Sequence, residues 1–145
     1  MNPPSPVRKR PAPVALVLAA GLGIRIKSRI PKLLHPLLGR PMLEFEIERV
    51  KLCQTIDRVV VVTSTSPEDQ LIVNLCRRLK VDVFCGNLEN VLDRFYQAGR
   101  QFQPDHIVRL TGDCPLIDAK VVDDMVMLYL EKKADYGSNC LPPTY

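Results

Sequence analysis

Two glycines and several cations follow an apolar run near the start of the sequence. The run of residues 14–19 leads into Gly21 and Gly23, and the twelve residues after Gly23 contain four cations and no acid. Buried strands are apolar runs, and glycine lets a backbone approach a ligand closely. Because Lys and Arg side chains bind phosphate, Arg25 and Lys32 suit a nucleoside triphosphate. The stretch therefore predicts a strand that opens onto a phosphate-binding loop.

An acidic residue stands beyond a later predicted strand, residues 106–110, which runs into Gly112 and Asp113. A hard cation such as Mg²⁺ takes carboxylate oxygen, which Asp113 can supply. Attack at the α-phosphorus of a triphosphate adds negative charge, so this reaction depends on positioning and on cations more than on covalent catalysis. The combination of Arg25, Lys32 and Asp113 therefore favours transfer of a nucleotidyl group.

Two common nucleotide-binding motifs are absent from the sequence. No GxxxxGK[ST] segment is present, and Gly21-x-Gly23 is followed by Ile26 where the dinucleotide fingerprint needs a third glycine. The second predicted strand ends in Thr63 and Ser64, without an acid to hold a ribose diol. These absences disfavour a hydride-transfer enzyme.

The pattern of apolar residues predicts alternating strands and helices. Strands are predicted over residues 14–19, 58–63, 81–85 and 106–110, and residues 134–139 are predicted to begin a fifth. Helices are predicted to begin at Pro41 and at Ser66–Pro67, to span residues 88–102, and to follow Asp118 as a cap. Ser66 is predicted to cap its own helix, and Glu44 is predicted to face water.

This alternation predicts an α/β fold with a mostly parallel sheet and helices on both faces. Ligands of such sheets bind at the carboxyl ends of the strands, where the strand order reverses. Three polar or glycine-rich segments follow predicted strands: residues 19–32, 85–94 and 111–118. We expect these segments to converge on one site.

Charge and composition narrow the classes of function. Of the formal net charge of +4, residues 1–13 carry +3, and five of these thirteen residues are proline. We predict a disordered, proline-rich basic tail over residues 1–13 and one nucleotide-binding unit over residues 14–145. The charge pattern argues against nucleic-acid binding, and no apolar run approaches the length of a membrane span. Five cysteines without metal-ligand spacing are predicted to be reduced thiols, mostly in the core, of a cytoplasmic protein.

Several motifs resemble those of sugar nucleotidyltransferases. The segment Leu18–Ala19–Ala20–Gly21-x-Gly23-x-Arg25, with Pro31–Lys32 and Pro41–Met42–Leu43, resembles the signature of sugar-nucleotide pyrophosphorylases. Residues 90–96 (NVLDRFY) and 106–118 (HIVRLTGDCPLID) resemble cytidylyltransferases of the spore-coat-polysaccharide type, relatives of the acylneuraminate cytidylyltransferases. The resemblance implies a Rossmann-like, three-layer αβα fold, that of the nucleotide-diphospho-sugar transferases. We expect the chain to be truncated at the C-terminus relative to that domain.

The resemblance also implies roles for individual residues. Arg25 and Lys32 would be catalytic, holding the triphosphate and its developing charge, and Asp113 would coordinate Mg²⁺. Eight positions would bind the nucleotide: Ala19, Ala20, Gly21, Gly23, Gly86, Asp93, Arg94 and Gly112.

The implied reaction joins a nucleoside triphosphate, with CTP favoured, to an acidic or phosphorylated sugar, and it releases pyrophosphate with the help of Mg²⁺. The implied partners are these two substrates, with no nucleic acid or membrane, and the chain is open to homodimer formation. Ala19–Ala20–Gly21 is the opening of uridylyl- and other nucleotidyltransferases, and the chain is shorter than such domains usually are, so two alternatives stay open. One is a uridylyl- or other sugar-1-phosphate pyrophosphorylase, and the other is a non-catalytic nucleotide-binding module.

Overall fold

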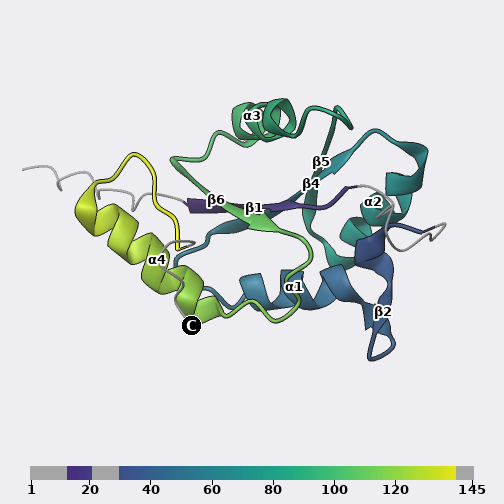
Figure 1. Ribbon diagram of the computed structural model, residues 1–145, viewed down its shortest axis with the longest axis horizontal. Helices are drawn as coiled ribbons and strands as arrows, with labels where there is room; N and C mark the ends of the chain where they lie inside the picture. The colour runs from purple at the N-terminus through teal and green to yellow at the C-terminus, as the bar shows by residue number, and fades with distance from the viewer. Residues whose placement is uncertain (1–12, 21–29, 140–145) are drawn as a thin grey trace, which may run out of the picture.

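The centre of the protein is a parallel sheet of four strands (Figure 1). The structure is a computed structural model that describes residues 13–20 and 30–139. Within these residues the sheet has the strand order β5–β4–β1–β6. Its strands are β1 (Pro13–Leu18), β4 (Arg58–Ser64), β5 (Asp82–Gly86) and β6 (His106–Thr111). The predicted α/β class, the parallel pairing and the four strands are confirmed.

The first strand of the sheet has a neighbour on each side. Leu18, the last residue of β1, pairs with Val62 of β4 and with Thr111 of β6. The chain therefore moves outward in one direction through β4 and β5 and then returns to the other side of β1 at β6. The strand order reverses at β1, so the carboxyl end of β1 is the expected place for a ligand.

Helices cover both faces of the sheet, with α3 on one face and α1, α2 and α4 on the other (Figure 1). The four α-helices are α1 (Met42–Val50), α2 (Gln70–Leu79), α3 (Val91–Phe102) and α4 (Ala119–Lys132). Shorter elements are the 3₁₀ helices η2 (Lys32–Leu34) and η3 (Pro67–Asp69) and the hairpin of β2 (Pro36–Leu37) and β3 (Arg40–Pro41). None of the helices in the described part of the chain is both long and apolar enough to cross a membrane.

Alternation along the strands divides the core between the two faces. Leu16 and Val60 pack with Phe95 and Ala98 of α3. On the opposite face Ala15, Val17, Val59 and Val61 pack with residues of α1 and α2. Both faces of the central strands are buried, which explains why their sequences are continuous apolar runs.

The predicted helix start at Ser66 is wrong in its details. The Ser66 hydroxyl contacts the Glu68 carboxylate and caps no backbone group, and Pro67 begins the 3₁₀ helix η3 rather than α2. The buried acid of this turn is Asp69, whose Oδ2 accepts a hydrogen bond of 3.2 Å from the Ser64 N–H. The turn is tied back to the end of β4 by the Asp69 side chain, so Asp69 rather than Ser66 makes the local contact to the backbone.

Two further predictions are corrected by the packing. Glu44 does not face water, because its side chain is only 12% exposed and forms ion pairs with Arg40 and Arg78. Residues 134–139 form no strand. The Ala134 N–H donates to the Tyr129 carbonyl and thus completes the end of α4.

The cysteines in the described residues form no disulfide, and half of them lie outside the core. Cys53 and Cys76 are buried, whereas Cys85 and Cys114 are exposed. Burial raises the pKa of Cys53 to about 11 and that of Cys76 to about 12. These two side chains therefore remain protonated thiols at neutral pH. Only two of the four described cysteines are core residues, and Cys140 lies outside the described residues.

The predicted cap of the last helix is confirmed, and it supports a stability prediction. Asp118 Oδ1 accepts hydrogen bonds from the backbone N–H groups of Lys120 (2.8 Å) and Val121 (3.2 Å). Replacing Asp118 with Ala leaves both donors without this partner, so we expect the free energy of unfolding to fall by about 1 kcal/mol in urea titrations. As the control, Asp124→Ala removes only an exposed ion pair on the same helix and should change stability by less than about 0.5 kcal/mol. Equal losses in the two variants would contradict the capping role.

Candidate active site

A lysine and an aspartate 81 residues apart meet at the carboxyl end of the sheet. Lys32 Nζ donates a hydrogen bond of 2.8 Å to Asp113 Oδ2, and the two side chains are 41% and 45% exposed. This hydrogen bond, together with the positive charge of Lys32, holds the pKa of Asp113 below its ordinary value, although partial burial opposes the shift. The site thus presents an ionised carboxylate and an ammonium group that both reach solvent.

The position of Asp113 depends on a close approach between two backbones. The Gly112 N–H donates a hydrogen bond of 2.8 Å to the Leu18 carbonyl. A Cβ atom at position 112 would lie 2.5 Å from that carbonyl oxygen and 2.9 Å from Leu33 Cδ1. Only glycine fits here without displacement, and it brings Asp113 alongside η2, the helix that begins at Lys32.

Glu46 is a buried glutamate beside the turn that carries Asp113, and it was not predicted from the sequence as part of the site. Glu46 is fully buried on α1, and its Oε2 accepts a hydrogen bond of 2.9 Å from the Cys114 N–H. Burial raises the pKa of Glu46 to about 7; the Cys114 N–H opposes this shift and the charge of Asp113 adds to it. The helical spacing was a usable signal, because Glu46 follows Leu43 by three residues and precedes Val50 by four, which places it on the apolar face.

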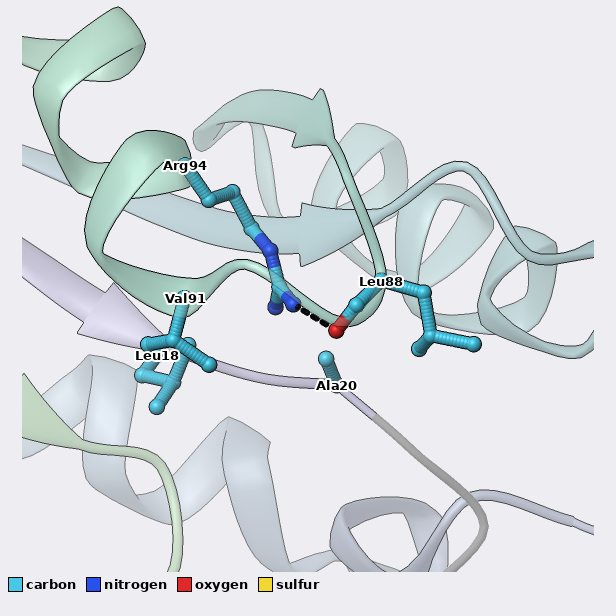
Figure 2. A pocket seen from close by; sticks show the side chains of 5 residues that line it. All are labelled: Leu18, Ala20, Leu88, Val91 and Arg94. Carbon is cyan, nitrogen blue, oxygen red and sulfur yellow. Dashed lines mark hydrogen bonds between the residues drawn. The ribbon is translucent and has the colours of Figure 1, made fainter.

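A second part of the site is a small pocket beside the end of β1 (Figure 2). The pocket has a volume of about 210 Å³ and is lined by Leu18, Ala20, Leu88, Val91 and Arg94. Four of these side chains are aliphatic, so the pocket is apolar with one cationic wall. Leu18 lines it and also accepts the hydrogen bond from Gly112, so it joins the two parts of the site.

Arg94 is buried although it belongs to an amphipathic helix. Its Nε donates to the Asn87 carbonyl at 2.8 Å, and its Nη2 donates to the Leu88 carbonyl at 2.6 Å (Figure 2). Nη1 is buried and has no hydrogen-bond partner among the described residues. Burial lowers the pKa of Arg94, while the charge of Asp69 opposes the shift. The guanidinium therefore fixes the turn before α3 through Nε and Nη2.

The remaining predicted residues differ in where they lie. A Cβ at Gly86 would be 2.8 Å from Arg94 Cγ, so this glycine makes room for the arginine rather than lining the pocket. Asp93 accepts a hydrogen bond from Gln97 Nε2 and does not line the pocket. Ala19 is buried, and its N–H donates to a carbonyl of β4. Gly21, Gly23 and Arg25 lie outside the described residues.

The three segments that were predicted to converge do meet. Lys32 and Asp113 join the first segment to the third, and the pocket joins Ala20 to Leu88, Val91 and Arg94 of the region after β5. A cation, a carboxylate and an apolar pocket thus lie together at the reversal point of a parallel α/β sheet of the Rossmann-like type, where such sheets bind their ligands.

Comparison with known proteins agrees with this class. Residues 25–144 match the family model described as cytidylyltransferase, and the chain belongs to this family. It is 30% identical over 128 residues to the spore coat polysaccharide biosynthesis protein SpsF of Bacillus subtilis, covering 85% of this chain and 52% of SpsF. The predicted resemblance to sugar nucleotidyltransferases is confirmed.

Solved structures share the fold. A cytidylyltransferase from Leptospira borgpetersenii superimposes with a TM-score of 0.76 at 32% identity, over 86% of this chain and 51% of that one. A CMP:2-keto-3-deoxy-manno-octonic acid synthetase in complex with CTP gives a TM-score of 0.69 at 21% identity, over 85% and 49% of the two chains. The chain spans about half the length of the curated relatives it matches first.

The contact at Gly112 gives a test of how the site is built. Gly112→Ala puts a Cβ against the Leu18 carbonyl, so we expect a loss of about 1–3 kcal/mol in the free energy of unfolding. The matched control is Gly99→Ala within α3, where the nearest atom, Ile107 Cδ1, would be 3.3 Å away and helix propensity favours alanine. If Gly112→Ala is as stable as Gly99→Ala in urea titrations, the close approach is not needed.

Burial of Glu46 gives a test based on pH. The pKa of Glu46 rises from 4.5 to about 7 on folding, so as pH increases the unfolded chain loses this proton at a lower pH than the folded chain does. The free energy of unfolding should therefore fall as pH rises from about 5 to 7, by on the order of 2 kcal/mol. Glu46→Gln should remove most of this dependence, whereas the exposed Glu48→Gln should retain it. Parallel curves for wild type and Glu46→Gln between pH 5 and 8 would contradict the assignment.

Proposed function

We propose that this chain is the nucleotide-binding part of a Mg²⁺-dependent cytidylyltransferase. The reaction transfers the CMP group of CTP to an acidic or phosphorylated sugar and releases pyrophosphate. The observation that carries the proposal is the Lys32–Asp113 pair beside an apolar pocket at the reversal of the sheet. Family membership, the part of SpsF in spore coat polysaccharide biosynthesis and the CTP complex of the synthetase support it.

The pocket suits the base of the nucleotide. Leu18, Ala20 and Val91 offer aliphatic contacts to a flat ring, and Nη1 of Arg94, which has no partner among the described residues, offers N–H donors. A pocket with mostly apolar walls and few polar groups is typical of small-molecule sites. A donor at Nη1 suits a carbonyl oxygen such as that of a pyrimidine.

Asp113 suits a Mg²⁺ ion that shares its coordination with the substrate. The carboxylate is ionised and about half exposed. In the described part of the chain no group of three or more His, Cys, Asp or Glu side chains is placed to hold a metal ion. Mg²⁺ commonly takes one or two protein carboxylates and completes its shell with water and phosphate oxygens, so a single aspartate fits. When bound, the ion would supply positive charge at the phosphates.

Lys32 is proposed to neutralise charge on the phosphates. Its ammonium group is 41% exposed at the mouth of the site, within reach of a ligand that enters from solvent. Arg25, which follows β1 in the sequence, is proposed to act in the same way on the strength of the sequence pattern. Positioning and electrostatic stabilisation of this kind carry most of the catalysis in phosphoryl and nucleotidyl transfer.

Titration with CTP, UTP and ATP, each with and without Mg²⁺, tests the proposal through the melting temperature. CTP with Mg²⁺ should raise it most, since a ligand at 100 times its Kd adds about 2.7 kcal/mol to the stability. A larger shift with UTP would favour the uridylyltransferase alternative. If no triphosphate at millimolar concentration changes the melting temperature, the proposed function is wrong.

Substitution of Asp113 tests the metal role separately. Asp113→Asn should abolish most of the Mg²⁺-dependent part of CTP binding, because the amide is a poorer ligand than the carboxylate. Asp82 is a matched control, because its exposure is 44% and it also pairs with a cation, Arg58. CTP binding by Asp82→Asn should keep its Mg²⁺ dependence. An unchanged dependence in Asp113→Asn would remove Asp113 from the metal site.

A further inference from the structure

We infer that Glu46 is a positioning residue, which holds the turn that carries Asp113 against helix α1. The inference rests on the proposed function for its consequence, because it assigns Glu46 to the orientation of the metal-binding carboxylate. Its starting point is a single contact between residues that are 68 positions apart in the sequence, the hydrogen bond from the Cys114 N–H to Glu46 Oε2.

The turn is attached to the rest of the protein on both sides of Asp113. On one side the Gly112 N–H donates to the Leu18 carbonyl of β1. On the other side the Cys114 N–H donates to Glu46. Asp113 is the residue between these attachments, so the two contacts together limit the directions in which its carboxylate points.

Helix α1 is a rigid support for the second attachment. Leu43, Ile47 and Val50 are fully buried in the main core, so the backbone that carries Glu46 is fixed by packing. The same helix supports the far end of the turn, where Arg49 Nε donates to the Ile117 carbonyl. Because α1 makes both contacts, the turn is held over several residues rather than at one point.

A carboxyl group at position 46 carries an energetic penalty that packing alone does not explain. Glu46 Oε1 is buried without a hydrogen-bond partner among the described residues. An apolar side chain could fill this buried position on α1 with a smaller loss of stability, since an unpaired buried polar atom costs about 1–3 kcal/mol. The group compensates by accepting the Cys114 N–H, a backbone donor that needs a partner when it leaves water. The side chain is therefore suited to holding the turn.

Fixing the turn also fixes the position of the Asp113 carboxylate relative to Lys32. With the turn held, Asp113 Oδ2 lies 2.8 Å from Lys32 Nζ. Residues that orient a metal ligand typically contribute 10–100-fold to metal affinity. Loss of the contact should therefore weaken Mg²⁺ binding while sparing the base pocket, whose lining residues do not include Glu46.

Two substitutions at this position separate the hydrogen bond from simple packing. Glu46→Leu keeps an apolar core and removes the acceptor, whereas Glu46→Gln keeps an oxygen acceptor of the same size. In the full chain without ligand, amide hydrogen exchange at Cys114 should be at least about tenfold faster in Glu46→Leu than in wild type. In Glu46→Gln it should stay near the wild-type rate, and exchange in β4 should be unchanged in both. Wild-type exchange at Cys114 in Glu46→Leu would overturn the inference.

Mg²⁺ titration of CTP binding tests the effect on the metal. Glu46→Leu should raise the Mg²⁺ concentration for half-maximal binding by about tenfold, Glu46→Gln should restore it, and CTP affinity without metal should be alike in all three. Equal weakening with and without Mg²⁺ would show a general structural defect and overturn the positioning role. If the wild type binds no triphosphate, the proposed function fails, whereas the exchange experiment needs no ligand and still decides whether Glu46 holds the turn.

Discussion

The carboxyl end of β1 is the constraint on which the site depends. Leu18 pairs with strands on both sides, accepts the Gly112 N–H and lines the pocket. Because β1 lies where the strand order reverses, the loops after its neighbours leave in opposite directions and open a space above it. The cation–carboxylate pair and the pocket both lie at this end of the sheet. A shift of β1 would move both parts together.

Two buried ionisable side chains support this site at some cost to stability. Glu46 and Arg94 are both almost fully buried, and each keeps one polar atom without a partner in the described residues. Each also anchors backbone next to the site: Glu46 holds Cys114, and Arg94 holds Asn87 and Leu88. Buried groups of this kind are expensive unless hydrogen-bonded, so their presence beside the end of β1 suggests that they serve the site rather than the stability of the fold.

Local patterns predicted most of the elements but not the contacts that override them. The strands were predictable from apolar runs, and Asp118 was predictable as a cap because capping is a local interaction. Ser66 was also predicted as a cap from the local sequence, but that prediction was wrong, since Asp69 ties the turn to β4. Glu44 was predicted to face water, yet it forms an ion pair with Arg78, which is 34 residues away in the sequence. The Glu44 error arose because a partner distant in the sequence decided the outcome, whereas at Ser66 a neighbouring acid made the backbone contact instead.

The sequence by itself determined the α/β class, and it predicted a ligand site at the reversal point with Lys32 and Asp113 as its charged groups, because periodicity and residue chemistry are local properties. Only the tertiary structure decided that these two side chains meet at 2.8 Å, that Arg94 is buried against the turn before α3, and that Glu46 lies beneath Cys114. Those facts depend on strand order and helix packing, which bring together segments separated by up to 81 residues. The pattern of residues along the sequence does not show which distant residues become neighbours in the fold.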